Sequence, residues 1–461
     1  MNGAVDLQLG EPELTFRAAG DTLVRRSVLP SGVRVLSEQM PGSRSATVGF
    51  WVAVGSRDEH PAETGHSATF GSTHFLEHLL FKGTATRSAL DIAVAFDAVG
   101  GEHNAVTAKE YTCYFAKVQD RDLSMAVEVL ADMFTSSVLD PDDFESERGV
   151  ILEELAMAGD DPADVANERF FEAVLGTHPL ARPIGGDPAT ISAATRDAVR
   201  EHYRASYRAR DLVVTAAGAV DHDALVSGLT EALAAAGWDL DVAAAPVDRR
   251  PTEPALVEGR SPLTVVDRPG EQAHLVMGVP GLVATDDDRA TLSVLNTVFG
   301  AGMSSRLFQQ IRERRGLAYA VYSFAPGYSD AGVFGMYAGC APKNAATVAA
   351  LMRTELERLA HHGVTDDELT RATGYLGGAS ALALEDSDTR MSRLGRAELA
   401  LGEFADLDEA LRRVGRVTAD DVRALATELA ARPFSLVAVG PVDERTFRSV
   451  VDQPDARSDV A

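Results

Sequence analysis

Two histidines and a glutamate fall within the five-residue run His74-Phe75-Leu76-Glu77-His78. On a helix, His74 and His78 lie about 40° apart on one face, and Glu77 lies about 60° from His74. Two imidazoles on one face can hold a metal ion, and a carboxylate beside them can accept a proton from water. Burying three polar side chains without a shared ion would cost several kcal/mol, which favours a metal site over a hydrogen-bonded core. We therefore predict a metal site with His74 and His78 as ligands.

A short helix is predicted to carry this run. Ser72 and Thr73 each offer an N-cap oxygen, and Lys82 followed by Gly83 suits a C-terminal end. The anchoring residues are apolar: Phe75, Leu76, Leu79, Leu80 and Phe81. The preceding segment, 60–73, contains two more histidines, His60 and His66, which could join the metal, although they suit a surface loop better.

A catalytic zinc ion usually has three protein ligands, so a third ligand is required. Residues 140–158 predict a helix, because Asp140 can cap it and Pro141 suits its first position. The predicted helix carries four glutamates: Glu145, Glu147, Glu153 and Glu154. Glu147 and Glu154 are seven residues apart and project from almost the same side. Periodicity alone favours four solvated carboxylates and leaves the third ligand open.

The run from His74 to Thr84, together with residues 147–154, resembles the pitrilysin and insulin-degrading-enzyme family of inverzincin zinc peptidases. The closer resemblance is to its two-domain branch, which includes the β subunit of mitochondrial processing peptidase and bacterial relatives. Further similar stretches lie at 100–105, 178–185 and 304–319. The likeness therefore covers nearly the whole chain.

The resemblance implies a ligand set and a base. It implies that Glu154 is the third ligand, so that His74, His78 and Glu154 hold one Zn²⁺ per chain. It also implies that Glu147 orients a ligand and that Glu77 is the general base. This set of ligand types also suits manganese or cobalt, so the sequence leaves the divalent metal open.

The resemblance also implies contacts with the substrate. Arg312 and Tyr319 match positions at which the family binds substrate near the metal, and in the two-domain branch these residues come from a partner chain. Without the family, Arg312 would be a helix-surface charge and Tyr319 a packing aromatic. Asn104 and Ala105 match positions at which the family binds the substrate main chain as an added strand. Without the family, they would belong to a polar hairpin.

These implications predict a metalloendopeptidase that cleaves unfolded peptides inside a chamber formed by a dimer, with a zinc-activated water and Glu77 as base. A homodimer is expected, with a heterodimer with a related subunit as the alternative. A non-catalytic scaffold or regulatory subunit of a heteromeric processing peptidase is a second hypothesis, and a metal hydrolase with other substrates is a third. The complete set of ligands with Glu77 favours the peptidase.

Two domains are predicted from a proline-rich connector at 241–262. Residues 20–240 would form the zinc-binding catalytic domain, and residues 263–450 a second homologous domain without the metal motif. Strand-like runs ending at Gly218 and Gly440, 222 residues apart, indicate an internal duplication. The alternation of strands and helices, sharpened by the resemblance, predicts α+β domains, each with a mainly antiparallel sheet packed with helices.

The composition of the chain indicates the class of protein, its cellular compartment and the partners it disfavours. The 461 residues are 45% hydrophobic and 24% charged, which suits a globular enzyme. The only cysteines, Cys113 and Cys340, exclude a disulfide framework, and no signal peptide or membrane span is recognised, so we expect a cytoplasmic protein. With 43 basic and 69 acidic residues, the formal charge of −26 disfavours nucleic acid and anionic membranes as partners. It could attract basic peptides or serve solubility alone.

Overall fold

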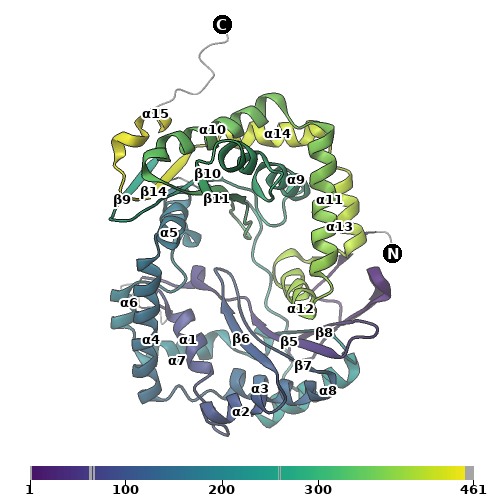
Figure 1. Cartoon of the computed structure of the whole chain (residues 1–461). Coiled ribbons are helices and arrows are strands. Elements are labelled where there is room, and N and C mark those ends of the chain that lie inside the picture. Colours follow the sequence, from purple (N-terminus) through teal and green to yellow (C-terminus); the bar gives the residue numbers. More distant parts are fainter. Residues whose placement is uncertain (1–2, 62–64, 66–67, 258, 260, 452–461) are drawn as a thin grey trace. The chain divides into compact units, whose positions relative to one another are not determined.

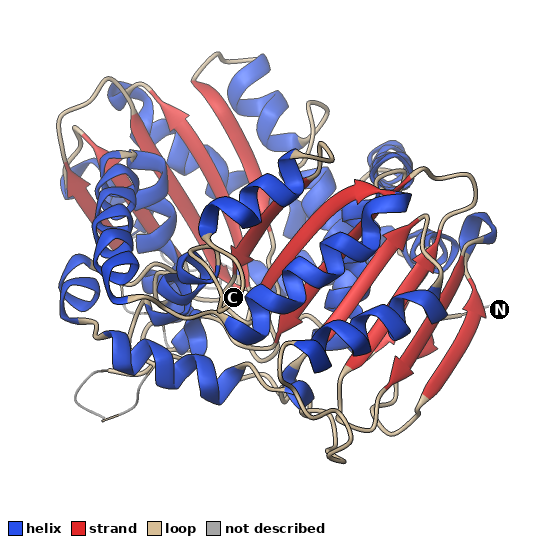
Figure 2. Ribbon diagram, turned by 90° about the horizontal axis from the view of Figure 1, so that it is seen from below, coloured by secondary structure: helices blue, strands red, loops and turns tan. Residues whose placement is uncertain are grey.

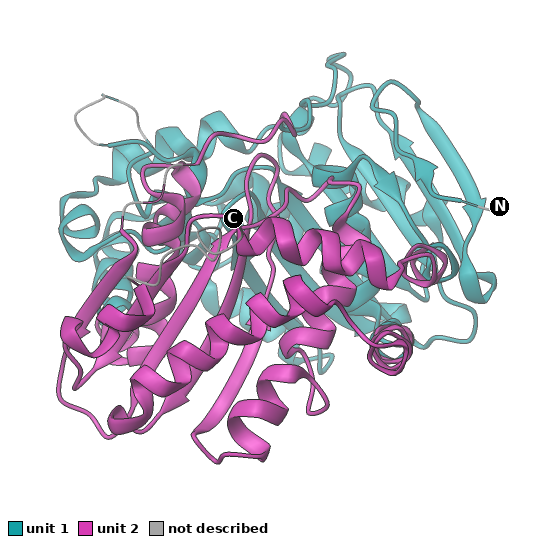
Figure 3. Cartoon of the chain, turned by 90° about the horizontal axis from the view of Figure 1, so that it is seen from above, with its two compact units in different colours: residues 1–155, 183–250, 380–409 teal, residues 156–182, 251–379, 410–461 magenta. Residues whose placement is uncertain are grey.

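The computed structural model describes residues 3–61, 65, 68–257, 259 and 261–451, whose helices and strands are labelled in Figure 1. The chain divides into two compact units, coloured teal and magenta in Figure 3. Unit 1 comprises residues 1–155, 183–250 and 380–409, and unit 2 comprises residues 156–182, 251–379 and 410–461. Each unit is therefore assembled from segments that are far apart in the sequence.

Unit 1 is built on a seven-stranded sheet. In spatial order its strands are β2 (Glu13–Arg17), β3 (Leu23–Val28), β4 (Arg34–Gln39), β8 (Val213–Gly218), β5 (Ser45–Val52), β7 (Thr112–Gln119) and β6 (Glu102–Thr107). Neighbouring strands are antiparallel except β4 and β8, which are parallel. Strand β6 is an edge strand of this sheet. A small second sheet pairs β1 (Val5–Asp6) with β13 (Glu403–Phe404).

Helices cover both faces of this sheet, drawn as red arrows beside blue helices in Figure 2. Alternate residues of β5 point to opposite faces, so Val48, Phe50 and Val52 enter the main core while Trp51 enters a smaller one. The main core also takes residues from α1 (Ser72–Leu80), α2 (Ala89–Asp97), α3 (Leu123–Ser136), α4 (Pro141–Asp160), α6 (Pro188–Ala193), α7 (Arg196–Ser206) and α8 (His222–Ala235). On the other face lies α12 (Ser387–Arg396).

Unit 2 repeats this design with five strands. In spatial order they are β11 (Ala318–Phe324), β12 (Val333–Cys340), β10 (Ala273–Pro280), β14 (Ser435–Gly440) and β9 (Leu263–Asp267). The main core of unit 2 takes residues from α9 (Arg289–Gly300), α10 (Ala345–His362), α14 (Ala419–Ala430) and α15 (Arg448–Val451). The other face packs against α5 (Pro162–Leu175). The remaining long helices are α11 (Asp366–Ala383) and α13 (Leu407–Gly415).

The two sheets share one topology. The order β4-β8-β5-β7-β6 in unit 1 matches β9-β14-β10-β12-β11 in unit 2, and the first pair is the parallel one in both. The middle strands of this shared order are β5 and β10, and each carries a glycine that faces one helix, α12 in unit 1 and α5 in unit 2. A Cβ at Gly49 would lie 2.5 Å from Met391 Sδ, and one at Gly278 would lie 2.8 Å from Phe170 Cζ. The predicted fold class, two similar α+β domains with mainly antiparallel sheets, is confirmed.

The compact units do not coincide with the predicted domain ranges. Helix α5 lies within 20–240 but packs on the sheet of unit 2, and α12 lies within 263–450 but packs on the sheet of unit 1. In each unit the second face of the sheet carries apolar residues, and a helix from the other predicted domain range covers them. The ranges 20–240 and 263–450 remain a prediction about the repeated sequence. Between them, the described part of 241–262 contains no helix or strand, and the change of unit falls between Arg250 and Pro251.

Two buried carboxylates hold the 380–409 segment against the sheet of unit 1. Glu398 is fully buried and binds Arg26 of β3 through two hydrogen bonds of 3.0 Å. The roles are reversed at Glu38 of β4, which binds Arg390 and Arg393 of α12. Unpaired buried charges are costly, so these reciprocal pairs favour one position of α12 on the sheet.

Both cysteines are free and buried, Cys113 in unit 1 and Cys340 in unit 2. Within the described ranges, none of the helices combines the length and the apolar character needed to cross a bilayer.

Candidate metal centre and catalytic site

Helix α1 presents the predicted site residues on its less buried side. Phe75, Leu76, Leu79 and Leu80 are fully buried and anchor the helix in the main core. His74, Glu77 and His78 are only partly buried. Phe75 stacks on Phe144 of α4, with ring centroids 4.4 Å apart and planes 10° apart. This packing sets the two helices that carry the predicted ligands beside each other.

The predicted N-cap of α1 is wrong. Gly71, with a φ of +88°, is the cap residue, and Ser72 and Thr73 already belong to the helix. The free N–H groups at this end are satisfied by Glu59, whose carboxylate accepts from the N–H of Gly71 at 2.8 Å and of Thr73 at 2.7 Å. Glu59 is 1% exposed. The sequence did not predict this role, because Glu59 is 12 residues before Gly71 and capping rules consider only adjacent residues.

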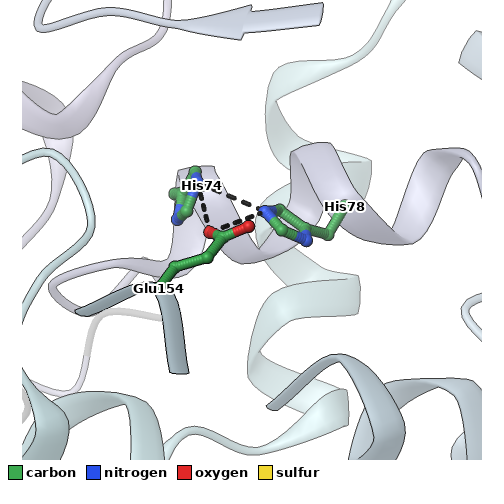
Figure 4. A group of neighbouring side chains, drawn as sticks. All are labelled: His74, His78 and Glu154. Atoms are coloured by element: carbon green, nitrogen blue, oxygen red, sulfur yellow. Dashed lines mark hydrogen bonds and ion pairs between the residues drawn. The ribbon is translucent and has the colours of Figure 1, made fainter. Parts of the chain in front are cut away.

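The structure brings the three predicted ligands together, and their side chains point toward one another in Figure 4. Nε2 of His74 and Nε2 of His78 lie 3.3 Å apart. Oε2 of Glu154 on α4 lies 3.5 Å from Nε2 of His78 and 3.8 Å from Nε2 of His74. Among the described residues, this is the group of histidine, cysteine and acidic side chains whose geometry suits a metal ion.

The distances fit a zinc ion. Tetrahedral zinc with ligands at about 2.0–2.2 Å holds neighbouring ligand atoms about 3.3–3.5 Å apart. The separations of 3.3, 3.5 and 3.8 Å are close to that range. Two imidazoles and one glutamate also form a known donor set of catalytic zinc, which leaves a fourth position for water.

Glu147 lies behind His78. Its Oε2 is 2.9 Å from Nδ1 of His78, and its Oε1 is 2.6 Å from Nζ of Lys82. A carboxylate only accepts, so Nδ1 of His78 carries the proton and Nε2 presents its lone pair to the site. Lys82 was expected only as a helix-end residue. Its ion pair with Glu147 offsets the charge of a carboxylate that is 4% exposed.

His74 is held differently. Burial, followed by the proximity of His78, lowers the pKa of His74 to about 4, and the opposing effect of Glu154 is smaller. The ring is therefore neutral near pH 7, the form that binds metal. Its Nδ1 is buried with no hydrogen-bond partner among the described residues. Gly185 lies against this ring, since a Cβ there would be 3.8 Å from Nδ1 of His74 and 3.0 Å from Leu155 Cδ2.

Glu77 shares the face of α1 with the two histidines. Burial raises the pKa of Glu77, and a hydrogen bond from the hydroxyl of Thr107 opposes that shift. A carboxyl group with a raised pKa exchanges protons more readily near neutral pH. Thr107 was not singled out from the sequence, because it is 30 residues from Glu77.

Asn104 and Ala105 lie on the edge strand β6. Asn104 is exposed and Ala105 is half-buried. The Oδ1 of Asn104 accepts a hydrogen bond of 2.8 Å from the N–H of Ala105. Strand β6 also packs against α1, so the edge and the metal ligands belong to the same unit.

Arg312 and Tyr319 belong to unit 2, whereas the metal ligands belong to unit 1. The guanidinium carbon of Arg312 lies 5.0 Å from the ring centroid of Tyr319. Arg312 sits in a π-helical turn, Phe308–Glu313. The strand register of β11 shifts between Ala318 and Ala320, and Tyr319 between them is 76% exposed. Such irregularities often redirect side chains at functional sites.

Of the two histidines before α1, the structure describes only His60. His60 pairs with Thr69 in an isolated bridge and is not part of the metal group. His66 lies outside the described residues.

Comparisons of the sequence with protein families find two matches. Residues 34–188 match the family described as "Insulinase (Peptidase family M16)". Residues 193–374 match the family described as "Peptidase M16 inactive domain". The first range contains His74, His78 and Glu154, and the second contains Arg312 and Tyr319.

Whole-chain relatives carry consistent names. An uncharacterized zinc protease of Streptomyces coelicolor is 48% identical over 92% of this chain and 90% of its own length. An uncharacterized zinc protease of Mycobacterium tuberculosis is 45% identical over 90% of this chain and 93% of its own length. Among solved structures, a protease from Helicobacter pylori has a TM-score of 0.78 at 22% identity, covering 91% of this chain and 99% of that one. A peptidase M16 inactive domain from Pseudomonas fluorescens has a TM-score of 0.79 at 19% identity, covering 94% of this chain and 98% of that one.

Proposed function

Because this chain belongs to peptidase family M16, we propose that it is a zinc-dependent endopeptidase that hydrolyses unfolded peptides. The observation that carries the proposal is the convergence of His74, His78 and Glu154, with Glu77 on the same helix. A site for metal alone would not need Glu77, a further carboxylate on the same helix as the two imidazoles. The two relatives are named as uncharacterized zinc proteases, and these names support zinc as the metal.

The side chains have separate roles in this proposal. His74, His78 and Glu154 hold the ion, and Glu147 keeps the proton of His78 on Nδ1. Bound Zn²⁺ would supply Lewis-acid chemistry, polarising the peptide carbonyl and lowering the pKa of water. Glu77 accepts the proton of the attacking water and returns it to the departing amine. Its raised pKa suits this cycle, because the carboxyl must both gain and lose a proton near neutral pH.

The substrate would bind as a strand along β6. An edge strand offers backbone groups for pairing with an extended peptide, and recognition through the backbone depends little on the peptide's side chains. Folded proteins seldom offer a free extended segment of this kind. The preferred substrates in this proposal are therefore unfolded peptides of varied sequence.

Peptide digestion tests this function. The purified chain loaded with zinc should cut a mixed library of unstructured peptides at internal bonds, with products mapped by mass spectrometry. Chelation should abolish cleavage, and added zinc should restore it, because in this proposal the metal ion polarises the peptide carbonyl and activates the water. A zinc-loaded chain that leaves the library intact would refute the peptidase proposal. That result would favour the scaffold hypothesis, with which the match to an inactive domain over residues 193–374 also agrees.

We also propose that the enzyme works as a homodimer whose chains enclose a chamber, with Arg312 and Tyr319 acting at the partner's metal site. Their location in unit 2 and the exposure of Tyr319 are compatible with this role. A heterodimer with a related subunit is the alternative.

Mixing two inactive variants tests the shared site. Glu77→Gln chains keep Arg312, and Arg312→Ala chains keep Glu77, so a heterodimer has one complete site. After random exchange of equal amounts, activity should return to about a quarter of the wild-type value per chain. Size and mass measurements must demonstrate the heterodimer. Heterodimers without recovered activity would contradict action in trans.

A further inference from the structure

Thr107 ends the edge strand β6 and touches the carboxylate of Glu77. Its hydroxyl donates a hydrogen bond to Oε2 of Glu77. Thr107 is 8% exposed, and Glu77 is also largely shielded from water. A hydrogen bond to a carboxylate is stronger in such surroundings than in water. The contact joins residues of two elements, the strand β6 and the helix α1.

We propose that Thr107 is a positioning residue, whose hydroxyl holds the Glu77 carboxylate in the orientation required for proton transfer and ties it to the strand edge at which the peptide binds. This inference rests on the proposed peptidase function and adds a residue to it. It assigns the hydroxyl no proton-transfer step of its own.

The base needs such a partner. The backbone of Glu77 is fixed by α1, but its side chain has three rotatable bonds, and each must be set before the carboxylate can meet a water molecule. Across the described residues, Thr107 is the side chain that hydrogen-bonds to Glu77. The hydroxyl bond engages Oε2. The backbone of Thr107 also hydrogen-bonds to the Glu77 carboxylate, and a valine at position 107 would keep that second bond. Losing the hydroxyl would remove one of these two bonds and let the carboxylate turn more widely about the remaining backbone bond.

Strand β6 connects this contact to substrate binding. His103, Ala105 and Thr107 alternate along β6 and so share one face. His103 stacks on Phe96 of α2 at 4.4 Å, and Ala105 packs against the main core, which fixes the strand on that face. A peptide added at the free edge would pair with the same strand. Substrate pairing and base orientation would therefore be coupled through Ala105 and Thr107, two residues apart.

A purely structural role for Thr107 is the competing explanation, and Thr112 provides a matched control. Thr112 on β7 pairs directly with Thr107 and is fully buried. Its hydroxyl donates to the backbone oxygen of Val54 at 2.9 Å. Replacing either threonine with valine removes one buried hydroxyl and keeps the shape of the side chain. Only the change at position 107 removes a contact with Glu77.

The experiment compares the zinc-loaded variants Thr107→Val, Thr107→Ser and Thr112→Val with the wild type on one peptide substrate. Thr107→Val should lower kcat about tenfold to a hundredfold and change KM by less than about twofold. Thr107→Ser should restore most of the lost kcat, because it restores the hydroxyl. Thr112→Val should keep the wild-type kcat even if its unfolding temperature falls. In a Glu77→Gln background, Thr107→Val should lower the residual activity no further, because both changes act on one group.

Different results would contradict the peptidase function and the role of Thr107. An inactive wild type that contains zinc would overturn the peptidase function and the Thr107 role with it. An active wild type with an unchanged kcat in Thr107→Val would overturn the Thr107 role alone. So would an equal loss of kcat in Thr112→Val, a failure of Thr107→Ser to restore kcat, or an undiminished effect of Thr107→Val in the Glu77→Gln background. Zinc content, measured for every variant, confirms that the metal site is intact.

Discussion

Glu77→Gln protein should bind zinc like the wild type and lose nearly all peptidase activity. The amide has the shape of the carboxylate but cannot accept the water proton, so kcat should fall about a hundredfold to ten-thousandfold. Glu77 is not one of the three converging ligands, which is why zinc content should not change. Peptide cleavage by purified, zinc-assayed protein measures the effect.

The Glu77→Gln substitution should leave the fold around the site unchanged. Glutamine can still accept the hydrogen bond from Thr107, so the fold around the site should be preserved. The unfolding temperature of Glu77→Gln protein should therefore stay close to that of the wild type. Substantial peptide cleavage by this variant would overturn the assignment of Glu77 as the base, while leaving the metal site unaffected.

Glu154→Ala protein should lose both zinc and activity. The substitution removes the only proposed ligand outside α1 and leaves two imidazoles. We expect zinc affinity to fall by at least about a hundredfold, since even changes behind a ligand cost tenfold to a hundredfold. Peptidase activity should fall in proportion to the lost zinc. Competition with a chelator of known affinity measures the zinc affinity, and peptide cleavage measures the peptidase activity.

The neighbouring Glu153 provides the control for Glu154. Both glutamates are exposed on α4, but Glu153 is turned about 100° away and is not part of the metal group. Glu153→Ala changes the net charge and helix composition in the same way, so it should keep zinc and activity. The Glu154 side chain is 47% exposed, and its loss should barely affect the stability of the metal-free fold. Full zinc retention by Glu154→Ala protein would remove Glu154 from the ligand set.

Local spacing was enough to predict the helices that hold the site. A separation of four residues places His74 and His78 on one face of a helix, and both helices form where the sequence predicts them. Asp140 does cap α4, because its Oδ1 accepts from the N–H of Asp142 at 2.8 Å. Periodicity could not choose Glu154 over the other glutamates of α4. That choice came from the family resemblance, and the structure places its carboxylate beside the two imidazoles.

Contacts between distant segments could not be predicted in this way. Glu59 accepts hydrogen bonds from N–H groups at the start of α1 across a loop, and Lys82, in the turn after α1, forms an ion pair with Glu147 of α4. The exchange of α5 and α12 between the two halves likewise has no local signature, because an apolar helix face does not specify which sheet will bury it.

By itself, the sequence determined the types of chemical group, their spacing along α1 and α4, and the duplicated architecture, because each depends on neighbours within a few turns or on repetition along the chain. Only the tertiary structure decided how α1 and α4 meet, which residue contacts Glu77, and which helix covers each sheet. These outcomes depend on side-chain packing and buried charge pairs between residues far apart in the sequence, where no local preference acts.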